Sequence, residues 1–145
     1  MISSRYAVAV HILSLIAFTP EQPQSSEDLA ASIGVHPVLV RSTLGLLRKA
    51  GLVHTRQGVA GSQLTRPLSE ITMLEVFRAV LDEKDLFSMH DQPNPNCPIG
   101  RNIQGSLEWV FLEATRGMEE RLARVTLADV VDDLSHRIDT PSSLV

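Results

Sequence analysis

The sequence has one cysteine and no long uninterrupted apolar run. A single cysteine excludes a disulfide framework within the chain and is typical of proteins in a reducing cytosol. The longest apolar run covers residues 6–18, which is 13 residues, whereas a membrane-spanning helix needs about 20. A signal peptide has an apolar core of similar length, but His11 and Ser14 interrupt this run and no clear cleavage site follows it. We therefore expect a buried helix in a cytoplasmic protein that has no membrane partner.

Motifs for catalysis and metal binding are also missing. The sequence contains no CxxC, no HExxH, no phosphate-binding glycine loop and no Gly-x-Ser-x-Gly. The five histidines are scattered, and His11, within the apolar run, is expected to be a hydrogen-bonded core residue. A cysteine-dependent enzyme using Cys97 and His90 would need a third orienting group and a pocket, and the sequence shows neither. We therefore predict no catalytic residues, no metal ligands and no enzymatic activity.

Acidic residues are absent between Asp28 and Glu70, although the formal net charge of the whole chain is −4. Residues 1–66 hold six Lys/Arg and three Asp/Glu, a net charge of +3, and residues 67–145 hold seven and 14, a net charge of −7. The acid-free interval contains five cations: Arg41, Arg48, Lys49, Arg56 and Arg66. A basic segment on an acidic protein is the pattern expected for a surface that binds a polyanion. Charge clusters are more often solvated faces, so composition alone leaves the two interpretations about even.

Capping signals place a helix-turn-helix just before and within this basic segment. Ser25 and Asp28 form a capping box that predicts a helix over residues 26–33, and Gly34 is suited to end it. Pro37 is suited to the first turn of another helix, which should run over residues 38–50 and end at Gly51. Two helices joined by a glycine-containing turn within about 25 residues are typical of this DNA-binding motif.

One face of the second helix has the composition of a recognition surface. Cations can bind phosphates, short polar side chains can contact base edges, and small residues allow close approach. Gly45 is open to two interpretations, close approach to a phosphate or close packing against another helix. The predicted face consists of Val38, Arg41, Ser42, Gly45 and Lys49.

The segment LVHTRQGVAGSQL, residues 52–64, predicts a β-hairpin directly after the helix-turn-helix. Such a hairpin is a wing. Gly58 and Gly61 should form its tip, and Arg56 can reach a minor groove or a phosphate. The ordered set of elements predicts double-stranded DNA as the partner. A winged helix used only for protein contact is the alternative, and the acid-free interval argues against it.

The second half of the chain predicts a long helix. Thr72 and Glu75 form a capping box for a helix to about Leu81, and a proline-rich loop over residues 83–98 follows. A helix over about residues 99–124 has an apolar stripe, and a last helix should cover residues 126–138 before a loose tail over 139–145. The stripe consists of Ile103, Leu107, Val110, Ala114, Met118 and Leu122.

A helix of about 37 Å has more apolar surface than a small winged helix can cover, so we expect a homodimer. In the alternative, the stripe folds onto the chain's own first helix. The fold class expected is mainly α: a winged helix-turn-helix DNA-binding domain over residues 1–82 with a β-hairpin wing, and a long C-terminal dimerisation helix within residues 99–138.

Four segments give the chain a family resemblance: SRYAVAVHILSLIA, LRKAGLVHTRQGVAGSQL, ITMLEVFRAV and PNPNCPIG. Over about residues 1–134, the chain resembles the Rrf2 family of bacterial winged-helix transcription regulators, and within it the YwnA-like members. The resemblance implies that recognition-helix residues enter the major groove and that a wing arginine enters the minor groove. These roles would fall on Val38, Arg41, Ser42 and Arg56.

The chain departs from the family pattern at two positions. His36 occupies the N-cap position where small polar residues are usual. Arg41 stands where some members carry an acid, which puts the operator sequence in doubt, because arginine prefers guanine edges and an acid prefers cytosine.

The resemblance also draws attention to Cys97. Cluster-binding members of the family use three cysteines in this loop, and this chain has one, so we expect no iron–sulfur cluster and no other cofactor. Three interpretations of Cys97 stay open: a half-buried apolar residue, a metal ligand, or a reactive thiol favoured by the helix that follows it. The function expected is a homodimeric, sequence-specific DNA-binding transcription regulator, a repressor, with Cys97 as a candidate sensing thiol.

Overall fold

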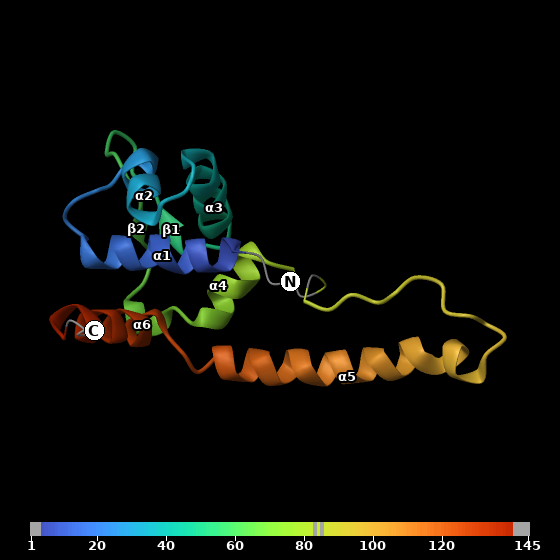
Figure 1. The fold of residues 1–145 in the computed structure, drawn as a ribbon. Helices are drawn as coiled ribbons and strands as arrows, with labels where there is room; N and C mark the ends of the chain where they lie inside the picture. The colour runs from blue at the N-terminus through green and yellow to red at the C-terminus, as the bar shows by residue number, and fades with distance from the viewer. Residues whose placement is uncertain (1–3, 83, 85, 141–145) are drawn as a thin grey trace, which may run out of the picture.

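The structure, a computed structural model, describes residues 4–82, 84 and 86–140. A helical body carries a two-stranded hairpin on one side, and one long helix projects from it as an arm (Figure 1). This is the mainly helical winged architecture that the sequence predicts, although the strands have only two residues each. The elements in chain order are α1 (Arg5–Phe18), α2 (Ser26–Ile33), α3 (Pro37–Lys49), β1 (Val53–His54), β2 (Gln63–Leu64), the 3-10 helix η1 (Leu68–Glu70), α4 (Met73–Val80), α5 (Pro98–Leu122) and α6 (Leu127–Asp139).

The helix-turn-helix forms as its capping signals predict. The Ser25 hydroxyl accepts a hydrogen bond from the Asp28 backbone N–H at 3.1 Å, and the Asp28 carboxylate accepts one from the Ser25 backbone N–H at 3.2 Å. Gly34 ends α2 with a φ of 81°, a left-handed conformation that glycine adopts without strain. The axes of α2 and α3 are bent by 111°, within the range for this motif. Among the described residues no single helix could cross a membrane by length and composition, and this bent pair passes that test only when its two halves are combined.

The core lies where α1, α3 and α4 meet. Ala9, Ile12 and Leu13 of α1 are completely buried, as are Val40 and Leu47 of α3 and Val76 of α4. On α4, Phe77 is buried and meets the Tyr6 ring edge-on, with the ring centroids 5.6 Å apart. The Tyr6 hydroxyl donates to the Met73 carbonyl at 2.8 Å, and burial raises the pKa of this hydroxyl. The core therefore fixes α3 on the rest of the body from the side opposite its exposed face.

The wing packs against the loop between α1 and α2. Val53 pairs with Leu64 and His54 with Gln63 in the antiparallel register. Gly61 has a φ of 89°, and a Cβ atom placed there would lie 2.7 Å from the Pro23 Cβ. Gly58, in the same tip, has a φ of 78° but open space around the corresponding position. Gly61 therefore holds the wing against the body, whereas Gly58 only shapes the turn.

The α5–α6 corner is joined to the start of α4 by backbone hydrogen bonds. The Met73 N–H donates to the Val125 carbonyl and the Leu127 N–H to the Ile71 carbonyl, each at 2.8 Å. Thr72 and Thr126 pair across this junction, and each caps the helix that follows it with a complete capping box. We call residues 71–73 together with 125–127 the junction. It sets where α5 ends and α6 begins relative to the helix-turn-helix and the wing.

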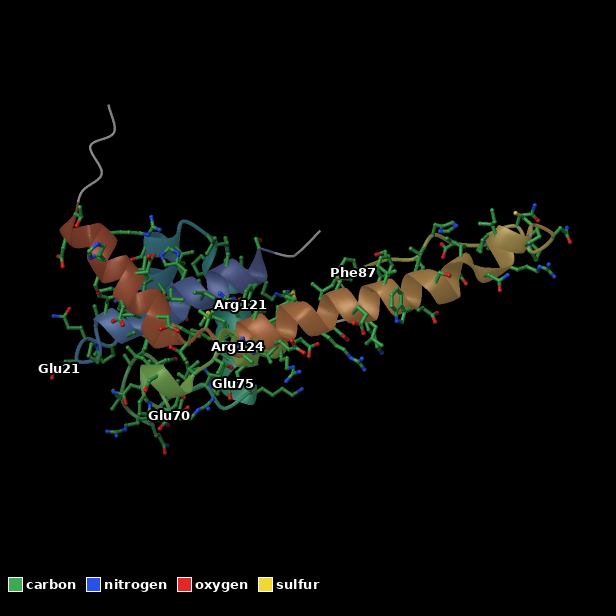
Figure 2. All side chains as sticks on the ribbon, turned by 90° about the horizontal axis from the view of Figure 1, so that it is seen from below. Glu21, Glu70, Glu75, Phe87, Arg121 and Arg124 are labelled. Carbon is green, nitrogen blue, oxygen red and sulfur yellow. The ribbon has the colours of Figure 1, made fainter. Side chains whose placement is uncertain are left out.

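Arg66, just after the wing, is bound to the start of α4. It donates to the Glu75 carboxylate at 3.1 Å and to the Glu70 carbonyl at 2.9 Å. Burial alone would raise the pKa of Glu75, but the hydrogen bonds from Thr72 and Arg66 and the charge of Arg66 outweigh it and lower that pKa. Figure 2 shows Glu70 and Glu75 together near this end of α4.

Helix α5 stands away from the body, and none of its 25 residues, all of them described, is buried (Figure 1). The loop after α4 runs back along it, and Phe87 stacks on Phe111 with ring centroids 4.7 Å apart (Figure 2). The Arg78–Glu119 ion pair, 2.9 Å long, ties α4 to α5. The arm therefore does not fold onto α1, which was the alternative interpretation of its apolar stripe.

At the other end of the body, α6 lies under α1 (Figure 1), and its Val130 and Val131 pack on the core. One expectation, that of a core His11, needs correction there. His11 is not a core residue, because it is exposed and lines an apolar groove of about 870 Å³ between α1 and α6. The periodicity of α1 could not reveal this, because α1 is apolar nearly all round and its packed face has no clear signature. Residues 141–145 of the expected tail lie outside the described residues.

The wing packing predicts different costs for two glycine substitutions. Gly58→Ala should lower the free energy of unfolding by about 1–2 kcal/mol, the cost of a left-handed alanine. Gly61→Ala should cost at least about 1 kcal/mol more, because its methyl group must also displace Pro23. Denaturant unfolding of the two variants beside the wild type measures the difference. Equal losses for both would show that the wing does not depend on the Pro23 contact.

Candidate nucleic-acid interface

The exposed face of α3 presents the side chains that the sequence assigns to DNA. Val38 is 57% exposed, and Arg41, Ser42 and Lys49 are exposed along the same helix. A Cβ placed at Gly45 would meet nothing within 4 Å. Close packing against another helix therefore does not explain this glycine in the single chain. Open space at Gly45 leaves room for a phosphate or sugar to approach the helix.

The N-terminus of α3 is capped by an unexpected residue. The His36 Nδ1 accepts a hydrogen bond from the Val38 backbone N–H at 3.1 Å. This imidazole therefore accepts the capping hydrogen bond that a small polar side chain usually accepts at a helix N-terminus. The departure at His36 thus leaves the start of the recognition helix intact.

Arg41 is paired with an acid from the preceding helix. Its Nη1 lies 2.9 Å from the Glu27 Oε1, and both side chains stay more than half exposed, at 52% and 65%. Glu27 precedes the acid-free interval by sequence but borders the same surface in space. The sequence carries no signal for this pair, because its two residues are 14 positions apart on differently oriented helices.

The remaining cations of the interval divide into two groups. Arg66 is held by Glu75 and faces α4, so it does not extend the recognition surface. Arg48, Lys49 and Arg56 form no ion pair with any residue in the described part of the chain. These three are therefore available to phosphates.

Beside α3, the wing presents Arg56 in an exposed turn. The Val59 N–H donates to the Arg56 carbonyl at 3.1 Å, which closes the tip around Gly58. A small polar hollow of about 150 Å³ lies between the wing, the start of α2 and α3, and Ser25, Arg48 and Thr55 are among the residues lining it. The wing, α2 and α3 all lie on the side of the body away from α6 (Figure 1). The elements that carry the predicted DNA-binding residues thus lie on the same side of the body.

Cys97 is not part of this face. It is the N-cap residue of α5, at the end of the arm farthest from the body (Figure 1), and its side chain is half-buried. Its backbone N–H donates to the Asn94 carbonyl at 3.2 Å, and its sulfur makes no capping hydrogen bond. Its reactivity stays a prediction.

Residues 2–133 match Rrf2, described as an iron-dependent transcriptional regulator. The donor set does not fit an iron site held by one chain: the sequence has one cysteine, and no three His, Cys, Asp or Glu side chains in the described residues are placed to hold a metal ion. Iron–sulfur clusters are bound mainly by cysteine thiolates, commonly four.

Individual relatives agree with the family match. The chain is 45% identical to a Bacillus subtilis (strain 168) protein named HTH-type transcriptional regulator YwnA, over 92% of this chain and 99% of that protein. It is 42% identical to a protein with a crystal structure described as a DNA binding protein, with a TM-score of 0.72, covering 88% of this chain and 98% of the other. CymR, the global cysteine regulator of B. subtilis, shares the fold at 20% identity, with a TM-score of 0.67 over 91% of this chain and 96% of its own. The family is one of transcriptional regulators and not of enzymes, and this chain belongs to it as a member of the Rrf2 family.

Proposed function

We propose that the chain is a sequence-specific transcription repressor that binds duplex DNA as a homodimer. The observation that carries the proposal is the gathering of α3 and the wing on one side of the body, away from the arm (Figure 1). In this arrangement α3 enters a major groove while Arg56 reaches the adjacent minor groove or a phosphate.

The chemistry of the face supports a division between affinity and specificity. Arg48, Lys49 and Arg56, unpaired with any described acid, bind phosphates and supply a salt-dependent attraction. Val38, Arg41 and Ser42 sit near the start of α3, where they contact base edges. Repression requires only that the bound dimer occupies a promoter in the cytoplasm.

Apolar exposure on the arm supports the homodimer. Trp109 is 67% exposed, Val110 46% and Leu112 49%, and at the arm's outer end Ile99 is 73% exposed. Exposed apolar surface concentrated on one element is characteristic of a protein–protein contact. A second copy of α5 covers this surface and joins two DNA-binding faces, which matches a palindromic operator.

The DNA-binding proposal predicts two distinguishable losses. Arg41→Ala should lose discrimination at one or two base pairs by about 1–3 kcal/mol each, because a guanidinium pairs with a specific base edge. Arg56→Ala should weaken binding to all sequences and reduce the salt slope by about one, the contribution of one phosphate contact. Fluorescence-anisotropy titrations on duplexes selected from genomic fragments, at several salt concentrations, measure both.

Arg124→Ala is the matched control for these variants, since it removes an arginine at the end of α5 (Figure 2), outside the DNA-binding face. It should bind as the wild type does. Wild-type affinity and salt dependence in both the Arg41 and the Arg56 variants would refute the assignment of the interface. A dimer that selects no genomic duplex would favour the protein-contact alternative.

The dimer proposal predicts the effect of a charge on the arm. Val110→Glu should raise the dimer dissociation constant by about tenfold or more, because it buries an unpaired carboxylate in an apolar interface. Sedimentation velocity over a range of concentrations measures it. Ser69→Glu adds the same charge at an exposed residue of η1 and should leave the dimer unchanged. A wild-type protein that stays monomeric at tens of micromolar would contradict the proposal.

The thiol proposal assigns Cys97 as the sensing residue. Cys97 lies at the outer start of α5, and the sequence has no second cysteine with which it could form a disulfide within the chain, so oxidation has to add oxygen, cap the sulfur with a small thiol or link two chains. Thiol titration of the native protein should then show one rapidly reacting group, and blocking it should change operator affinity. Cys97→Ser is the control and should not respond to oxidant. A thiol that reacts only after denaturation would make Cys97 a structural residue.

A further inference from the structure

We propose that Glu27 is a specificity-determining positioning residue, which reserves Arg41 for base edges and keeps it from phosphates. The inference rests on the proposed DNA-binding function and assigns a role to a residue outside the expected recognition set. The observation behind it is the 2.9 Å ion pair between the Glu27 Oε1 and the Arg41 Nη1.

Glu27 is the carboxylate of α2 that is free to make this pair. Its neighbour Asp28 is occupied in the capping box, where one carboxylate oxygen accepts from both the Ser25 backbone N–H and the Ser25 hydroxyl, at 3.2 and 2.8 Å. Glu27 has no part in that box and reaches across to α3. The pair is therefore not a by-product of helix capping.

Among the cations of the face, only Arg41 forms an ion pair with an acid in the described part of the chain. Arg48, Lys49 and Arg56 have no acidic partner among the described residues. The other paired arginine, Arg66, is held toward α4 and away from the face. Arg41 is thus the one cation of the recognition helix, within the described part of the chain, that a carboxylate holds in place.

The chemistry of guanidinium explains what the pair achieves. Arginine has five N–H donors, so a carboxylate on Nη1 leaves others free for a second acceptor. A phosphate approaching Arg41 would meet the negative charge of Glu27, whereas the N7 and O6 of guanine are neutral acceptors. The pair therefore disfavours phosphate binding, which carries no sequence information, more strongly than base reading.

Exposure of both side chains keeps this effect moderate. Exposed ion pairs are weak because water and salt screen them. Glu27 therefore biases the position of Arg41 and does not lock it, and Arg41 can still adjust to a base. The consequence is a measurable change in selectivity and not a loss of binding.

The test compares Glu27→Gln with the wild type on two duplexes. One is selected by the wild-type protein from a random-sequence library, and the other is a scrambled duplex of the same composition. Glu27→Gln should bind the scrambled duplex about threefold or more tightly, with a salt slope steeper by about one, as expected when Arg41 gains a phosphate. Selection by the variant should lose base preference at the pair read by Arg41 and keep it elsewhere.

Three further variants separate positioning from bulk charge and from misfolding. Glu27→Asp keeps the carboxylate and should retain the wild-type preference. Glu21→Gln removes an exposed acid in the loop before α2 (Figure 2) and should leave the ratio of the two affinities unchanged. In an Arg41→Ala background, Glu27→Gln should have no further effect on base preference.

The outcomes separate this inference from the proposed function. If the wild type selects no duplex, the proposed function fails. If the wild type selects a duplex and Glu27→Gln retains its selectivity and salt slope, the function stands and the role of Glu27 is refuted. The same holds if Glu21→Gln reproduces the effect, or if the effect persists without Arg41.

Discussion

Two backbone hydrogen bonds at the junction fix how the arm, α6 and the DNA-binding body are arranged. Ile71 and Leu127 are completely buried there, and the N–H of Leu127 donates to the carbonyl of Ile71. Thr72 and Thr126, which pair across the junction, each start a helix with a capping box. One short pairing therefore determines where α4 begins, where the chain turns after α5 and how α6 returns beneath α1. Buried backbone groups that lost these partners would carry the full cost of an unmade hydrogen bond.

The face that we propose to bind DNA has fewer unpaired cations in the folded protein than the sequence of its segment suggests. Along the chain, the interval from Asp28 to Glu70 contains five cations and no acid between its ends. In the folded protein, acids from outside the interval pair with two of those cations, Glu27 with Arg41 and Glu75 with Arg66. Folding thus reduces a uniformly basic segment to a smaller set of unpaired cations. It also gives Arg41 an environment unlike that of its neighbours.

Local signals predicted most of the fold, and long-range contacts account for what they missed. Capping boxes at Ser25 and Thr72 predicted where α2 and α4 begin, because these hydrogen bonds join residues three positions apart. The exposure of His11 and the packing of α6 on α1 depend on which of several apolar faces is covered, and periodicity does not decide that. Glu27 and Pro23 were missed for the same reason, since each acts on a residue far along the chain. The exposed positions of α3 were predictable from its periodicity, but the pairing of Arg41 with Glu27 was not.

A small rotation at the base of α5 produces a large displacement of its outer end. Helix α5 has 25 residues, and the junction and the Arg78–Glu119 pair hold it to the body near its C-terminal end. It is about 37 Å long, so a rotation of about 5° at the junction shifts its outer end by about 3 Å. That shift is close to the rise of one base pair along B-form DNA, about 3.4 Å. A small change of backbone geometry at the junction is therefore amplified along α5, the longest helix among the described residues.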